Sequence, residues 1–364
     1  FGETSRTRSG PVCALEMTMA EIDALAVIHK ITTEGLSLGD MINAASRFTG
    51  AGQAATAEQV YRIWIQFNPD HPQLFVALFN FATLQSGIGG SETAIASLER
   101  AIGLNPDFLP AYINLGGLQE RAGGLETAIA TWNAGASRPL PFTGSNANYV
   151  FSAFKQIARA LLDAQQVSRA EAALWRCADL DPSQMDTIGR LVAARLGQCK
   201  WPALEPWERV DRRALLRGAN PLSVAAYSDD PFLQLGAAAG FITRDGSCAP
   251  EAIIAERRDA PIDLTGRRLR VGYVSSDLRD HAVGYLMAEL FELHDRDRVE
   301  VFAYYCGPPA TDGLNARTQA AVEHYTDIRG MTDDEAARRI ADDQIDILVD
   351  VNGHTRDSRT PVFA

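Results

Sequence analysis

The sequence LRVGYVSSDLRDHAVGYL, residues 269–286, decides the fold of the second half of the chain. It begins with a largely apolar and β-branched run over Leu269–Ser275, passes through a polar loop that contains His281, and continues into a helical pattern. In an open α/β sheet, ligands bind at the carboxyl ends of the strands, where loops lead into helices. The imidazole of His281, whose unperturbed pKa is about 6.5, therefore lies in a loop where a ligand-binding or catalytic residue is expected.

The same alternation of strand and helix patterns continues to the end of the chain. Strands are predicted at 269–275, 299–305, 325–328 and 345–351, and helices at 283–293, 315–323 and 333–342. Thr332, followed three residues later by Glu335, predicts a capping box at the start of the last of these helices. Strand–helix alternation indicates a parallel sheet with crossover helices, so we expect a Rossmann-like lobe.

A second polar loop follows the last predicted strand. The apolar run 346–351 leads directly into Asn352-Gly353-His354-Thr355, which we expect at the same sheet edge as His281. Two alternatives to a functional site stay open. Asn-Gly-His-Thr is also a typical turn sequence, and a histidine in a loop can form a hydrogen bond to the nearby backbone without any functional role. The carboxylates of Asp277 and Asp280 either orient the His281 ring or stabilise the N-terminus of the following helix through their negative charge. The common nucleotide-binding and hydrolase fingerprints are absent from the sequence.

The first half of the chain repeats itself every 34 residues. Residues 78–96 (LFNFATLQSGIGGSETAIA) align with residues 112–130 (YINLGGLQERAGGLETAIA) after that shift. Small residues at Ala57, Ala94 and Ala170 each stand twelve positions before a proline. Small residues let two helices pack closely, and a proline ends the second helix because it has no N–H to donate. A 34-residue unit of two helices resembles the tetratricopeptide repeat, whose copies stack into an α-solenoid.

The chain is too long, at 364 residues, for one ordinary domain. We predict an N-terminal helical segment over 1–50, the tetratricopeptide-type solenoid over 51–196, a helical bridge and linker over 197–265, and the Rossmann-like lobe over 266–364. The bridge is inferred from the helix-breaking steps Trp201-Pro202 and Glu205-Pro206. The predicted fold class is therefore an α-solenoid followed by an α/β lobe.

Four aromatic side chains of the solenoid have two interpretations. They either fill the core between helices or line a concave face that binds extended peptide. The residues are Trp64, Tyr112, Trp132 and Trp175. Aromatic residues at helical spacing more often fill the core.

Composition excludes several classes of protein. Asp and Glu outnumber Lys and Arg by 46 to 34, for a net charge of −12. The sequence therefore lacks the clustered Lys and Arg typical of a nucleic-acid-binding protein. Five scattered cysteines support neither a disulfide framework nor a zinc site, so a reducing, cytoplasmic location is the simplest interpretation. Apolar runs are too short to span a bilayer, and no signal peptide opens the sequence.

Residues 269–364 resemble the N-terminal catalytic half of the O-linked N-acetylglucosamine transferase family, including its SPINDLY-like members. The matching segments are LRVGYVSSDLRDH (269–281), VEVFAYYCGP (299–308), AARRI (336–340), IDILVDVNGHTR (345–356) and the final VFA. The repeats and the bridge segments WPALEPW and NPLSVAAYSDDPFLQL follow the order of that family. The resemblance implies a GT-B fold, in which this lobe is the first of two Rossmann-like halves.

The resemblance also implies a reaction and a site. The reaction is inverting, metal-independent transfer of N-acetylglucosamine from UDP-GlcNAc to Ser or Thr of proteins. His281 matches the family's histidine after the first strand and is expected to be catalytic, accepting the proton of the attacking hydroxyl. The residues expected to bind substrate are Asp277, Asn352, Gly353, His354 and Thr355. No cofactor is expected, because the nucleotide sugar is a co-substrate, and the expected partners are protein acceptors along the solenoid, without nucleic acid or membrane.

Two departures from the family pattern modify these expectations. Ala282 stands where the family often has proline after the histidine. The chain also stops before the family's second lobe, which holds most of the nucleotide, so we expect a fragment that is inactive alone. Two alternative functions stay open: a repeat scaffold with a degenerate lobe, and a protein O-fucosyltransferase that uses GDP-fucose.

Overall fold

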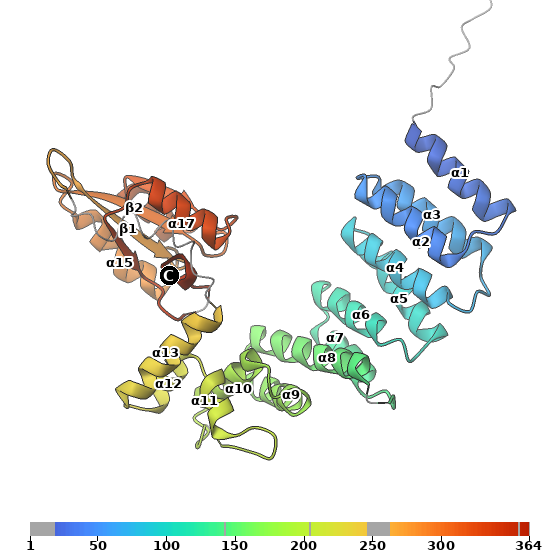
Figure 1. The fold of residues 1–364 in the computed structure, drawn as a ribbon, viewed down its shortest axis with the longest axis horizontal. Helices are drawn as coiled ribbons and strands as arrows, with labels where there is room; N and C mark the ends of the chain where they lie inside the picture. Colours follow the sequence, from blue (N-terminus) through green and yellow to red (C-terminus); the bar gives the residue numbers. More distant parts are fainter. Residues whose placement is uncertain (1–18, 142, 204, 246–262, 356, 364) are drawn as a thin grey trace, which may run out of the picture. The chain divides into compact units, whose positions relative to one another are not determined.

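The structure, a computed structural model, describes residues 19–141, 143–203, 205–245, 263–355 and 357–363 (Figure 1). The chain separates into two compact units between Asp181 and Pro182. Helix α10 (Met185–Gly197) groups with the second unit, and the domain boundaries expected at residues 50, 196 and 265 stay predictions. The part of the predicted linker at 246–262 lies outside the described residues, as do residues 1–18.

The first unit is an α-solenoid in which consecutive helices pair. Its described helices are α1 (Met19–Thr33), α2 (Leu38–Gly50), α3 (Ala54–Phe67), α4 (Leu74–Gly87), α5 (Ser91–Leu104), α6 (Leu109–Arg121), α7 (Leu125–Ala136), α8 (Gly144–Asp163) and α9 (Val167–Leu180). The helices α2 and α3 form a pair of the same kind as α4 and α5, and they share a core with α1. The solenoid therefore extends to the N-terminal side of residue 51.

The turn within each helix pair requires a residue in the left-handed conformation. Gly52, Gly89 and Gly123 have φ angles of 77°, 87° and 85° at these turns, and Gln165 has 59° in the fourth pair. A side chain in this conformation costs roughly 1–2 kcal/mol, which explains the repeated glycine. The fourth pair lacks the glycine, and its copy of the repeat is correspondingly hard to see in the sequence.

Small residues and aromatic residues together build the solenoid core. Ala57, Ala94 and Ala170 are fully buried, as the spacing to the prolines predicted. Trp64 and Trp132 are also fully buried, and each indole N–H donates to a backbone carbonyl, that of Leu36 at 2.8 Å and Ile113 at 3.1 Å respectively. These tryptophans are core residues rather than a concave binding face. Tyr112 is likewise buried, and its hydroxyl donates to the Pro106 carbonyl, whereas Trp175 is half-buried.

The second unit begins with a helical part. Its helices are α10, α11 (Arg212–Gly218), α12 (Pro221–Tyr227) and α13 (Pro231–Asp245). Asp211 and Asn220 cap α11 and α12, since each side-chain oxygen accepts a backbone N–H three residues later.

A parallel sheet forms the rest of the second unit. The strands β1 (Leu269–Ser275), β2 (Val299–Tyr305), β3 (His324–Asp327) and β4 (Ile347–Asp350) lie in the order β3-β2-β1-β4. All three strand pairings are parallel, and Val274 of β1 pairs with Tyr304 of β2 and with Asp350 of β4. The carboxyl ends of the strands therefore share one edge.

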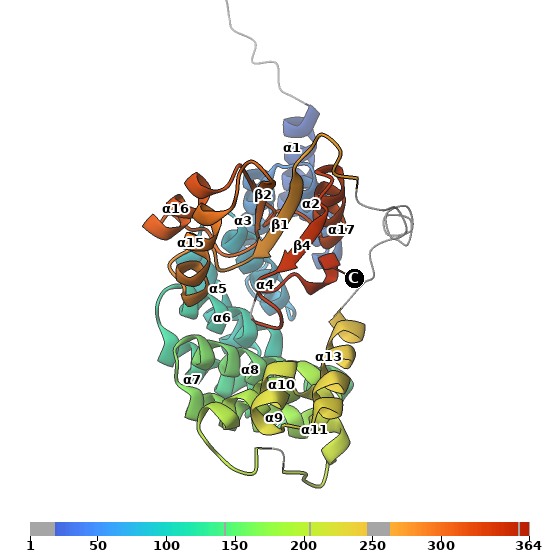
Figure 2. The ribbon, with the colours of Figure 1, turned by 90° about the vertical axis from the view of Figure 1, so that its left-hand side faces the viewer.

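Helices cover both faces of this sheet (Figure 2). On one face lie α15 (Ala282–Leu293) and α16 (Gly313–Ala321), over a core that includes Val271, Tyr273 and Phe291. On the other face lie α17 (Asp333–Asp342) and the short helix η1 (Thr360–Phe363), over a core that includes Phe302, Tyr304 and Ile340. Alternate residues of the strands supply the two cores, as expected for a sheet buried on both sides.

The predicted elements of the lobe agree closely with the structure. The bounds of β1, β2 and α17 are those predicted, and the other strands and helices differ by one or two residues at either end. The capping box at Thr332 and Glu335 is present with both of its hydrogen bonds. Among the helices that the structure describes, none combines the length and apolarity needed to cross a membrane.

Candidate functional site

The loops after β1 and β4 meet at the carboxyl edge of the sheet. Because β1 and β4 are adjacent and parallel, residues 276–281 follow one strand beside residues 351–355, which follow the other. The prediction that the two histidine-bearing loops share one edge is confirmed. A site at this edge has the location expected for ligands in an open α/β sheet.

Asn352 joins the two loops through its side chain. Its Oδ1 accepts the backbone N–H of Ser276 at 2.7 Å. Its Nδ2 lies within hydrogen-bonding distance of Ser276 Oγ at 2.7 Å, Asp277 Oδ2 at 2.9 Å and Thr355 Oγ1 at 3.1 Å. Asn352, Ser276 and Asp277 are all buried, so this amide holds the loops in one arrangement.

His281 begins helix α15 as its N-cap residue. Its Nδ1 accepts the backbone N–H of Val283 at 3.3 Å, and in a neutral ring this leaves the proton on Nε2. The side chain is 40% exposed. The interpretation of His281 as a loop histidine bonded to backbone is confirmed by this bond, whereas its role as a site residue stays a prediction.

Asp277 is the carboxylate of the site. Its Oδ2 lies 3.8 Å from Nδ1 of His281 and accepts the Asn352 amide, while its Oδ1 lies 3.6 Å from Nη2 of Arg279. Asp277 faces His281 rather than capping α15, whose N-cap is His281 itself. A carboxylate close to an imidazole can select which ring nitrogen carries the proton.

The other residues of the second loop have two different surroundings: Gly353 forms a turn, and His354 contacts helix α13. Gly353 has a φ of 59°, and its N–H donates to Asp350 Oδ1 at 2.9 Å. The ring of His354 stands edge-on to that of Phe241 in α13 at 5.2 Å, and its Nδ1 is buried with no hydrogen-bond partner in the part of the chain that the structure describes. His354 and Thr355 line a cavity of about 620 Å³ together with residues of α10. The structure thus joins Asn352 to the first loop and Thr355 to Asn352, whereas His354 faces α13.

Three residues of the site were not predicted from the sequence. Ser275 accepts the Asp277 N–H through Oγ at 3.0 Å, Ser276 bonds to Asn352, and Arg279 pairs with Asp277. Consecutive serines after an apolar strand were a usable signal, since polar side chains buried at a strand end are normally bonded. Nothing local in the sequence distinguished Arg279 from a solvated arginine.

Burial controls the ionisation of groups behind the site. Burial raises the pKa of Cys306 to about 12, and its thiol is therefore not a nucleophile at neutral pH. Burial likewise raises the pKa of Tyr305 to about 12. Within the described ranges, no three His, Cys, Asp or Glu side chains are grouped closely enough to hold a metal ion.

Comparison with known proteins finds a family that is similar to the part of the chain containing the two loops. The model of glycosyl transferase family 41 matches residues 256–364, which contain both loops. This part of the chain is similar to glycosyl transferase family 41. The chain is also similar to curated relatives over part of its length. A probable UDP-N-acetylglucosamine–peptide N-acetylglucosaminyltransferase SEC of Arabidopsis thaliana is 33% identical over 162 residues, which are 42% of this chain and 16% of the relative.

Two further relatives have similar names. The UDP-N-acetylglucosamine–peptide N-acetylglucosaminyltransferase of Caenorhabditis elegans is 42% identical over 102 residues, 27% of this chain and 9% of the relative. A probable SPINDLY enzyme of Hordeum vulgare is 30% identical over 105 residues, 28% of this chain and 11% of the relative. The matched part of this chain thus spans less than a fifth of the length of each of these relatives.

Solved structures show similarity over more of the chain at lower identity. A mutant of the Thermobaculum terrenum O-GlcNAc transferase matches 95% of this chain and 49% of its own, with 23% identity and a TM-score of 0.34. The C-terminal part of a tetratricopeptide repeat protein of Cytophaga hutchinsonii matches 62% of this chain and 92% of its own, with 14% identity and a TM-score of 0.45.

Proposed function

We propose that this chain supplies the acceptor-side lobe and the substrate-docking solenoid of a protein O-glycosyltransferase. The donor would be UDP-GlcNAc and the acceptors Ser or Thr side chains of proteins. The observation that carries the proposal is the cluster of His281, Asp277 and Asn352 at the sheet edge, inside the region that matches family 41. The names of the relatives support the choice of donor.

His281 would accept the proton of the attacking hydroxyl. As the hydroxyl oxygen bonds to C1 of the sugar, the bond from C1 to the diphosphate oxygen breaks with inversion, UDP leaves with the electron pair, and the hydroxyl proton passes to Nε2. General-base catalysis of this kind contributes typically 10²–10⁴ in rate.

This role requires a change of tautomer. While Nδ1 accepts the Val283 N–H, the ring proton is on Nε2, which cannot then accept another. The competent neutral form carries its proton on Nδ1, and the nearest acceptor for that proton is Asp277 Oδ2 at 3.8 Å. We therefore assign Asp277 to orient His281, and Asn352 to hold Asp277 in place.

The test is sugar transfer by the protein expressed from its complete coding sequence. The protein is incubated with radiolabelled UDP-GlcNAc, or with GDP-fucose in parallel, and with a lysate of its own source. We expect N-acetylhexosamine on Ser or Thr by mass spectrometry, and no product from the 364-residue chain alone. Deoxyhexose in its place would assign a fucosyltransferase, and no product from either donor would favour a scaffold.

Two variants test the assigned roles. His281→Ala should lower kcat by about 10²–10⁴, and Asp277→Asn should lower it while leaving the tertiary structure intact. His29→Ala removes an exposed histidine of α1 and serves as the matched control, with unchanged turnover. Retained turnover in His281→Ala would remove His281 from the chemical step.

A further inference from the structure

The carboxylate of Asp277 has one close hydrogen bond and two more distant neighbours. Its Oδ2 accepts the Asn352 amide at 2.9 Å and lies 3.8 Å from Nδ1 of His281, whereas its Oδ1 lies 3.6 Å from Nη2 of Arg279. Both longer distances exceed the usual range of a hydrogen bond. The two oxygens therefore face different partners, and small movements of the side chains decide which bonds form.

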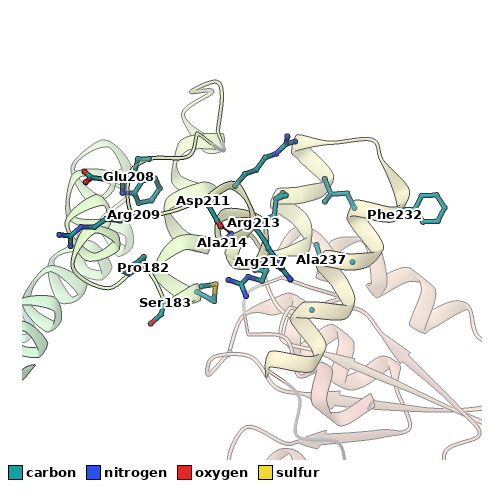
Figure 3. Close-up of a pocket in the computed structure, with 17 residues that line it drawn as sticks. Pro182, Ser183, Glu208, Arg209, Asp211, Arg213, Ala214, Arg217, Phe232 and Ala237 are labelled. Atoms are coloured by element: carbon teal, nitrogen blue, oxygen red, sulfur yellow. Dashed lines mark hydrogen bonds between the residues drawn. The ribbon is translucent and has the colours of Figure 1, made fainter.

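Arg279 is the charge partner of Asp277. Among the residues that the structure describes, it is the one arginine or lysine within 4 Å of the buried Asp277 carboxylate. Other arginines line a cavity of about 1290 Å³ among α10, α11 and α13, but no residue of the site loops lines that cavity (Figure 3). Burying an ionised carboxylate is unfavourable unless a cation or hydrogen-bond donors accompany it. Arg279 is therefore the positive charge that serves this carboxylate.

The guanidinium of Arg279 has no competing hydrogen bond. In the described part of the chain, its Nε is buried without a hydrogen-bond partner, and Asp277 is its ion-pair partner. The side chain is 29% exposed, so most of it is held inside the protein. An unbonded buried N–H is unfavourable, and a charge-assisted bond to a carboxylate is a strong one. Arg279 therefore gains by approaching Oδ1 of Asp277.

The backbone that carries these side chains is fixed against α15. At Gly284 a Cβ would stand 2.1 Å from the Arg279 carbonyl oxygen and 3.0 Å from that of Asp277. His281 begins the same helix as its N-cap residue. The backbone positions of the three residues are therefore coupled, and the remaining freedom lies in their side chains.

We propose that Arg279 is a positioning residue, which binds Oδ1 of Asp277 and thereby keeps Oδ2 facing Nδ1 of His281. In this orientation the carboxylate accepts a proton carried on Nδ1, and Nε2 can then accept another. Without Arg279 the carboxylate can turn, and Nδ1 keeps the Val283 N–H as its partner. The effect on the tautomer of His281 is independent of sugar transfer, whereas its consequence for turnover rests on the proposed function.

The experiment measures the His281 tautomer without any substrate. The chain is labelled with ¹⁵N at its six histidines, and the signals of His281 are assigned by their loss in His281→Gln. Spectra are recorded at about pH 8.5, roughly two units above the unperturbed pKa of imidazole. The ¹⁵N shifts of Nδ1 and Nε2 give the ratio of the Nδ1–H form to the Nε2–H form. Arg279→Gln should lower this ratio by about three- to tenfold, the scale of one hydrogen bond.

Further variants locate the cause. Arg279→Lys keeps the charge but not the planar fork of donors, so its ratio should lie between those of the wild type and Arg279→Gln. Arg279→Gln added to Asp277→Asn should change the ratio by less than about 1.5-fold, because both substitutions act on one interaction. Arg298→Gln removes an exposed arginine outside the site loops and is the matched control, with an unchanged ratio.

Two results would overturn the proposal. One is an unchanged ratio in Arg279→Gln. The other is an equal fall of the ratio when Arg279→Gln is added to Asp277→Asn, because Arg279 would then act on His281 by another route. Thermal denaturation checks that each variant folds, and if Arg279→Gln does not fold, Arg279→Lys with and without Asp277→Asn decides by the same criteria. A ratio that falls as expected in a protein without transferase activity would support the role of Arg279 and reject the proposed function.

Discussion

Asn352 is the residue on which the arrangement of the two site loops depends. One side chain provides an acceptor for a buried backbone N–H and donors to three oxygens from both loops. An amide is suited to this position because it combines a donor and an acceptor without charge. The sequence marked Asn352 as a site residue, but its joining of Ser276 to Thr355 depends on contacts between residues more than seventy positions apart.

Replacing Asn352 by Ala should destabilise the second unit. The buried Ser276 N–H would lose its acceptor, and the free energy of unfolding should fall by about 2–4 kcal/mol. Urea denaturation and hydrogen exchange at the Ser276 amide measure the effect. Thr355→Ala is the matched control, because among the described residues its hydroxyl bonds to Asn352 alone, and its loss should cost less than about 1 kcal/mol. Equal costs for the two variants would contradict the assigned role of Asn352.

At the scale of elements, α15 is fitted tightly against the loop that precedes it. Gly284 lies in the first turn of the helix, and a Cβ there would stand 2.1 Å from the Arg279 carbonyl oxygen and 3.0 Å from that of Asp277. Helix propensity alone favours alanine over glycine at this position by about 1 kcal/mol. The close approach reverses that preference, so the glycine couples the helix to the site loop.

Gly284→Ala should therefore destabilise the lobe by about 1–3 kcal/mol through overpacking and shift the loop that carries Asp277 and His281. Thermal denaturation and the NMR shifts of the His281 ring report the two effects. Gly313→Ala, at the first position of α16, is the control, since open space surrounds its Cβ position and stability should be unchanged or higher. A stabilising Gly284→Ala would show that the loop can move without cost.

The solenoid depends on packing within its helix pairs. Trp132 of α7 is fully buried, and its indole lies against Gly116 of α6, where a Cβ would stand 2.3 Å from Nε1. Trp132→Ala should lower the free energy of unfolding of the first unit by about 3–5 kcal/mol, from lost burial and the cavity left behind. Circular dichroism during urea denaturation measures this loss. The half-buried Trp175 is the comparison, and its replacement by Ala should cost clearly less.

At the scale of the whole molecule, ion pairs bind the strands of the lobe at the edge opposite the site. The Asp346 carboxylate accepts hydrogen bonds from Nη1 and Nη2 of Arg267, at 2.6 and 2.8 Å, and from the backbone N–H of Arg270 at 2.9 Å. The bonds from Arg267 lower the pKa of Asp346 against the opposing effect of burial. Burial raises the pKa of Glu323, but its bonds to Arg268 and to the Val301 N–H outweigh this and lower it overall.

The lobe should consequently lose stability in acid. A carboxyl group whose folded-state pKa is lowered stabilises the protein above its unfolded-state pKa of about 4 and loses that contribution as the pH falls through the folded-state value. The melting temperature of the lobe should be steady near neutrality and fall below about pH 4. Arg267→Gln should weaken this pH dependence, whereas Arg298→Gln, at an exposed position, should leave it unchanged. An unaltered acid transition in Arg267→Gln would show that Asp346 does not contribute to it.

The sequence by itself determined the order of elements, because the periods of helices and strands are local properties. The glycine at the turns, the buried alanines and the capping box of α17 followed from the same local physics. Placement of the two site loops at one edge required only that parallel strands align their carboxyl ends. The directions of the loop side chains were decided by tertiary structure, because they depend on which strands pair and on turns such as that at Gly353. Only the fold therefore shows that Asn352 joins the loops, that His281 caps α15, and that His354 faces α13.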